Sequence, residues 1–117
     1  MSAVRARGMP PASPAVLDLV RVRIERALTR RARYRYVHPH VEREGAGWKI
    51  VSPNCSRNVD PAGGAIDIAW LAPVEQGLWQ VHARDHAAAA WVRAGGPQPL
   101  DAALAQVCDD PDRRFWP

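Results

Sequence analysis

Apolar residues recur at every third or fourth position in the first part of the chain and predict a helix there. They follow Ser13-Pro14, in which serine suits the N-cap and proline suits the first helical position, where its missing N–H costs nothing. One stripe of a helix over residues 14–32 holds Leu17, Val20, Ile24, Ala27 and Leu28. We therefore expect that stripe to pack inward, and we expect residues 1–12 to form a flexible arm before it.

The pattern changes to a period of two after Tyr34, which indicates β-strands. β-Branched and aromatic residues alternate with polar ones, and turn-forming clusters at 43–47 and 73–77 are typical of hairpin loops. Strands are expected near residues 36–43, 47–53, 65–72, 78–84 and 88–93. The last segment is ambiguous, because its run of alanines with Asp85 as a cap favours helix, whereas Trp91-Val92 favours strand. We predict a strand there.

Three of these strands carry a tryptophan at the same parity as aliphatic residues. Alternation places three groups of residues on one face, one group from each strand. These groups are Trp48 and Ile50; Ile66, Ile68 and Trp70; and Trp79, Val81 and Ala83. One face of the sheet should therefore be apolar and rich in tryptophan, which suits packing beneath a helix.

A short second helix is predicted after Pro99. Leu100, Leu104 and Val107 share its buried stripe, and Pro111 ends it. The predicted fold class is α+β: a two-layer sandwich whose sheet of four or five antiparallel strands is covered on one face by a long N-terminal helix and a short C-terminal helix. At 117 residues the chain fits one such domain, over residues 13–117.

Four short motifs accompany this order of elements. They are Gly77-Leu78-Trp79-Gln80-Val81, Trp91-Val92, Pro99-Leu100-Asp101 and the ending Asp110-Pro111-Asp112-Arg113-Arg114-Phe115-Trp116. Together with the order of helix, strands and short helix, they resemble a family of small bacterial proteins known as domain of unknown function 3024, from about residue 17 onward. The chain differs after Pro53, where Asn54-Cys55 stand in place of an aromatic residue. The resemblance implies the architecture given above and assigns no activity.

The charge is concentrated at one end of the chain. The net charge is +4, yet residues 1–35 hold nine arginines and only two carboxylates, so the excess of positive charge belongs to that segment. The two cysteines, Cys55 and Cys108, lie far apart, and no apolar stretch suits a signal peptide or a membrane span. These features predict a cytoplasmic protein with free thiols and no membrane partner.

The sharpest candidate for chemistry is His38-Pro39-His40-Val41-Glu42. A period of two places His38, His40 and Glu42 on one face of a strand, and His82 on another strand could complete a metal site. The alternative is a solvated face, because Pro39 cannot donate to a strand ladder and so indicates a sheet edge. A metal-dependent enzyme is therefore one hypothesis for the function.

A second hypothesis is nucleic-acid binding through the arginine-rich helix, since guanidinium groups contact phosphates. The candidate residues are Arg23, Arg26, Arg30, Arg31 and Arg33. The alternative is an ordinary amphipathic helix that turns its arginines to water.

Nucleophilic catalysis has weaker candidates in Cys55 and Ser56, which lie in a loop, whereas Cys108 is expected in the core. No phosphate-binding loop is present and no cofactor is implied. Because no catalytic pattern stands out, we expect a non-catalytic binding or interaction module, with a second copy of the chain or a nucleic acid as possible partners.

Overall fold

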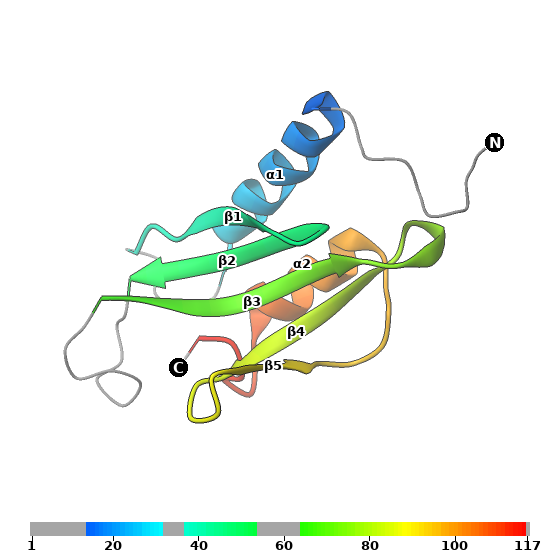
Figure 1. The fold of residues 1–117 in the computed structure, drawn as a ribbon. Helices are drawn as coiled ribbons and strands as arrows, with labels where there is room; N and C mark the ends of the chain where they lie inside the picture. The colour runs from blue at the N-terminus through cyan, green and yellow to red at the C-terminus, as the bar shows by residue number, and fades with distance from the viewer. Residues whose placement is uncertain (1–13, 32–36, 54–63, 117) are drawn as a thin grey trace.

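A computed structural model describes residues 14–31, 37–53 and 64–116 of the chain. It confirms the predicted α+β class (Figure 1). The elements in chain order are α1 (Pro14–Leu28), β1 (His40–Glu44), β2 (Gly47–Pro53), β3 (Ala65–Pro73), the 3₁₀ turn η1 (Glu75–Gly77), β4 (Trp79–Asp85), β5 (Ala90–Arg93) and α2 (Leu100–Asp109). The predicted arm, residues 1–12, lies outside the described residues.

The five strands form one antiparallel sheet in the order of the sequence, from β1 to β5. Each strand therefore pairs with the strand that precedes it, through a short hairpin wherever the connection is described. Gly45 adopts a φ of 58° in the two-residue turn between β1 and β2, a conformation that glycine reaches without strain. The ambiguous segment is a strand from Ala90 onward, so its helical alternative is not adopted.

Two predicted boundaries were wrong. β1 begins at His40 and not at residue 36, because Pro39 donates no backbone hydrogen bond and disfavours regular pairing beside it. α1 ends at Leu28 and not at residue 32, because the backbone tightens there into bonds between residues three apart, including Arg30 N–H to Ala27 O at 3.0 Å.

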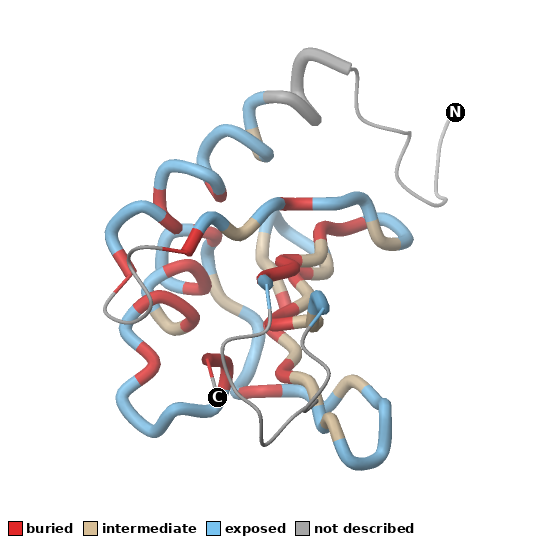
Figure 2. Tube along the Cα trace, turned by 90° about the vertical axis from the view of Figure 1, so that its left-hand side faces the viewer, coloured by how far each residue is buried: buried red, intermediate tan, exposed pale blue. Residues whose placement is uncertain are grey.

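The core lies between the sheet and both helices, which pack on the same face (Figures 1 and 2). As predicted, Ile24, Ala27 and Leu28 of α1 belong to this core and Val20 packs against it, whereas the side chain of Leu17 lies outside the described residues. The helix α2 contributes a second stripe. The largest fully buried aliphatic side chains are Ile24, Ile50, Ile68, Leu71, Val81 and Val107. Gly47 is required at the start of β2, because a Cβ there would stand 2.0 Å from the carbonyl oxygen of Leu71.

A β-bulge in β3 corrects the predicted placement of Trp70. Ile50 pairs with Ala69 and Val51 pairs with Asp67, so β3 holds one extra residue, Ile68, at this point. The alternation therefore changes parity: Ile68 is buried in the core, whereas Trp70 lies on the opposite face of the sheet and is only half-buried. The predictions for Trp48 and Trp79 are confirmed, since Trp48 is buried in the core and Trp79 packs against it.

The C-terminal motif closes the core. Asp110 follows α2 in the left-handed conformation, and its carboxylate accepts hydrogen bonds from the backbone N–H groups of Arg114, Phe115 and Trp116. The Trp116 indole is 1% exposed and donates to Val107 O at 2.9 Å. The aspartate of this motif is therefore a clamp on the chain end.

Candidate binding face of the sheet

The face of the sheet opposite the two helices carries one row of side chains that crosses all five strands. Strand pairing places Glu42, Lys49, Trp70, His82 and Arg93 side by side, one from each strand. No described element packs on this face (Figure 1). We call it the open face.

Aromatic rings occupy the centre of the open face. The rings of Trp70 and His82 are stacked, with centroids 4.4 Å apart and planes inclined by 27°. The Trp91 ring lies 6.1 Å from that of Trp70. The Trp70 indole donates to Glu44 O at 3.2 Å, and the Nδ1 atom of His82 lies 3.3 Å from Trp70 O. Backbone acceptors therefore fix the orientation of the two central rings.

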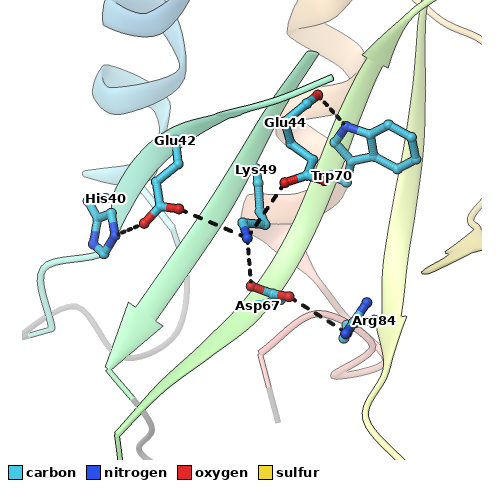
Figure 3. Close-up of polar contacts among 7 residues, drawn as sticks. All are labelled: His40, Glu42, Glu44, Lys49, Asp67, Trp70 and Arg84. Atoms are coloured by element: carbon cyan, nitrogen blue, oxygen red, sulfur yellow. Dashed lines mark hydrogen bonds and ion pairs between the residues drawn. The ribbon is translucent and has the colours of Figure 1, made fainter. Parts of the chain in front are cut away.

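A chain of ion pairs lies beside Trp70 on the open face (Figure 3). Asp67 lies between two cations, 3.4 Å from Lys49 Nζ and 3.7 Å from Arg84 Nε. Lys49 also lies within 4 Å of a carboxylate oxygen of Glu42 and of Glu44. Asp67 lies on the open face while its neighbour Ile68 stays in the core, and the bulge brings Trp70 to the same face as Asp67.

The β4–β5 side of the open face is rich in cations. The Arg84 guanidinium lies over the Trp91 ring at 4.9 Å from its centroid, in a cation–π contact. Arg93 is exposed at the end of the row described above. Burial and the neighbouring Arg84 lower the pKa of His86 below its usual 6.5, so its imidazole is neutral at pH 7. The acidic side, at β1, holds Glu42 and Glu44.

The predicted metal ligands are only partly brought together. His40 Nε2 lies 2.6 Å from Glu42 Oε2, but His38 precedes β1. His82 lies on β4, which two strands separate from β1, and it stacks on Trp70 instead. Among the described residues, no group of three His, Cys, Asp or Glu side chains is placed to hold a metal ion. The metal site stays a prediction without further support.

The predicted nucleic-acid arginines lie on the helical side of the molecule. Arg23, Arg26 and Arg30 line a groove between α1 and α2. Arg31 does not face water, since it is 4% exposed, donates to Leu28 O and Val37 O, and stacks on Trp116. Arg33 lies outside the described residues.

The predicted nucleophiles Cys55 and Ser56 also lie outside the described residues. Cys108 is buried as predicted, and its thiol contacts Ala27 O at 3.3 Å. Burial, together with the nearby Asp109 carboxylate, raises the pKa of the Cys108 thiol to about 11. This cysteine is therefore a protonated core residue at neutral pH.

Comparison with known protein families identifies the family of the chain. The family model described as a domain of unknown function, DUF3024, matches residues 13–117. The chain belongs to the DUF3024 family. Searches of curated proteins and of solved structures return no match. Within the described residues, α1 and α2 are both too short and too polar to cross a membrane. The family motif at residues 110–116 is the clamp described above, so its aspartate and tryptophan are explained by folding alone.

The sequence alone does not reveal the open face of this DUF3024 protein. Its alternation predicts Trp70 in the core and does not connect the charged residues Lys49, Asp67 and Arg84 with each other. The signal was present in the alternation of β2 and β4, which places Lys49 and His82 opposite the aliphatic residues. Only the bulge, however, brings Asp67 and Trp70 to the same face.

Proposed function

We propose that the protein is a non-catalytic binding module and that its open face binds single-stranded nucleic acid. The proposal depends on one observation: the centre of an antiparallel face on which no described element packs holds the Trp70–His82 stack with Trp91 beside it. Unpaired bases stack on aromatic side chains displayed in this way, and each such contact contributes about 1–3 kcal/mol.

Cations next to the rings support the choice of ligand. Arg84 and Arg93 lie on the same side of the open face as Trp91, where they can contact phosphates of a strand whose bases reach the rings. Asp67 is already neutralised by Lys49 and Arg84, which reduces its repulsion of phosphate. The carboxylates of Glu42 and Glu44 limit the expected footprint to β3, β4 and β5.

The fixed orientation of the Trp70 side chain also supports the binding of bases. Trp70 is held by Glu44 O and by the His82 ring, so little side-chain freedom remains to be lost when a base stacks. A short contact surface of this kind suits a few nucleotides rather than a duplex, because bases in a duplex do not present their ring faces.

The test is fluorescence polarisation with fluorescein-labelled 12-mers of uridine and of thymidine, and with a duplex of the same length. We expect the single strands to bind more tightly than the duplex and the affinity to fall as salt rises. Trp70→Leu and Trp91→Leu should each weaken binding about tenfold.

Thr29→Ala is the control, since Thr29 is exposed directly after the end of α1 and away from the open face. Circular dichroism establishes that each variant is folded. Single-strand affinity that is unchanged in both tryptophan variants would refute the proposal, as would the absence of binding at low salt. Binding that depends on Arg26 and Arg30 instead would favour the helical site predicted from the sequence.

A further inference from the structure

The N-terminal half of α1 projects beyond the sheet (Figure 1) and exposes apolar side chains. Leu19 is 64% exposed and Val22 is 40% exposed, whereas Ile24, Ala27 and Leu28 near the other end of the helix are buried. Because Leu19 and Val22 do not pack in the core, they do not stabilise this half of the helix through burial. Leu19 and Val22 lie three positions apart and are therefore neighbours on the surface of the helix.

The exposed apolar residues continue into a row of arginines. At 100° per residue, Leu19, Val22, Arg23 and Arg26 fall within an arc of about 100° on the surface of α1, and Arg30 follows two residues after the end of the helix. From Leu19 to Arg26 this stripe is about 10 Å long, or about two helical turns. We call it the outer stripe of α1.

Arg23 and Arg26 of the outer stripe, with Arg30 after them, form one wall of a groove of about 300 Å³ between α1 and α2. The apolar part of the groove lining comes from Ala27, Leu104, Ala105 and Cys108, and its second wall carries Asp101 and Asp109. Arg23 is paired with Asp101 at 2.7 Å. In the part of the chain that the structure describes, no ion pair reaches Arg26 or Arg30.

We infer that this groove binds an acidic amphipathic helix of a partner protein, which lies along the outer stripe of α1. Apolar side chains of the partner contact Leu19, Val22 and Ala105, and its carboxylates pair with Arg26 and Arg30. Both arginines are exposed and line the same groove, so carboxylates on one face of a helix can pair with both.

The composition of the groove favours a protein helix over nucleic acid. Exposed leucine and valine can pack against apolar side chains of a helix, whereas they offer a phosphate backbone nothing. The groove also lies across the sheet from the open face (Figure 1), so this inference is independent of the proposed function.

The test uses two synthetic 18-residue helical peptides as probes. Both carry leucine at three- and four-residue spacing, and the remaining positions are mainly glutamate in one and lysine in the other. Amide chemical shifts of the full-length protein, followed by NMR, report where each peptide binds. We expect the glutamate peptide to shift residues 19–30 and 104–109, and the lysine peptide to leave them unchanged.

Arg26→Gln/Arg30→Gln should weaken glutamate-peptide binding at least tenfold. Arg21→Gln/Arg113→Gln removes the same charge elsewhere, since Arg21 lies off the outer stripe and pairs with Glu25, and it should change the affinity less than threefold. Leu19→Gln tests the apolar contribution at an exposed position and should also weaken binding. Trp70→Leu should have no effect, which separates this site from the open face.

Equal binding of the two peptides, absence of binding by either, or equal loss in both arginine double variants would overturn the inference. So would a uridine 12-mer that shifts residues 19–30 while the glutamate peptide does not, because the groove would then be a nucleic-acid site.

Discussion

The Asp110 carboxylate accepts a hydrogen bond from the backbone N–H of Trp116 at 2.8 Å, and this contact holds the last described indole of the chain inside the core. The same carboxylate accepts from Arg114 and Phe115, so three N–H groups depend on one side chain that is 2% exposed. The most recognisable motif of the chain is therefore structural, which moves the search for function to surfaces that carry no motif.

Asp110→Ala should lower the free energy of unfolding by about 3 kcal/mol, because it leaves buried N–H groups without their acceptor. Urea denaturation followed by tryptophan fluorescence measures the change. Asp112→Ala, at an exposed position of the same motif, should cost less than about 0.5 kcal/mol. Equal losses in the two variants would contradict the clamp.

The two tryptophans Trp70 and Trp116 should differ in their contribution to stability. Trp116→Leu removes a ring that is 1% exposed and should cost about 3 kcal/mol. Trp70→Leu acts on the open face and should cost about 1 kcal/mol, mainly through the lost stacking on His82. Thermal and urea unfolding check both values, and a larger loss at Trp70 than at Trp116 would place Trp70 in the core after all.

The Cys108 thiol should be unreactive in the folded protein. Its pKa of about 11 leaves little thiolate at pH 8, so its reaction with a disulfide reagent should be about a hundredfold slower than in the unfolded chain. The Cys55→Ser background makes Cys108 the sole thiol, and the absorbance of the released reagent gives the rate. A rate in the native protein equal to that in urea would show that the thiol is accessible.

His86 should make stability depend on pH. Its pKa in the folded protein lies below the ordinary value of 6.5, so the unfolded chain takes up a proton first as pH falls. The contribution of His86 to the free energy of unfolding should therefore decrease as pH falls from 6.5 to the pKa of the folded state. Below that pKa the contribution should not change further. Chemical denaturation of the wild type and of His86→Gln between pH 8 and pH 5 measures this effect. We expect the variant to gain stability relative to the wild type toward pH 5, and a constant difference would exclude the role of His86.

Most of the secondary structure could be predicted because its signals are local. Three- and four-residue spacing marked α1 and α2, and alternation marked the strands. The two wrong boundaries fall at element ends. Proline, which has no N–H, delays the start of β1 after Pro39, and a tightened turn ends α1 at Leu28, although the periodic pattern continues in both places. The candidate site was predicted less well, because its residues come from all five strands and meet only through the pairing of those strands.

The sequence by itself determined the class of fold, the order of the elements and the aliphatic residues of the core, because burial of alternating or periodic apolar residues is decided within each element. Tertiary structure decided which face each tryptophan occupies. One extra residue in β3 reverses the alternation of a strand, and whether the chain accommodates that residue as a bulge depends on its pairing with β2 and on packing beneath the helices. For that reason Trp70 reaches the open face, on which Asp67 meets Lys49 and Arg84.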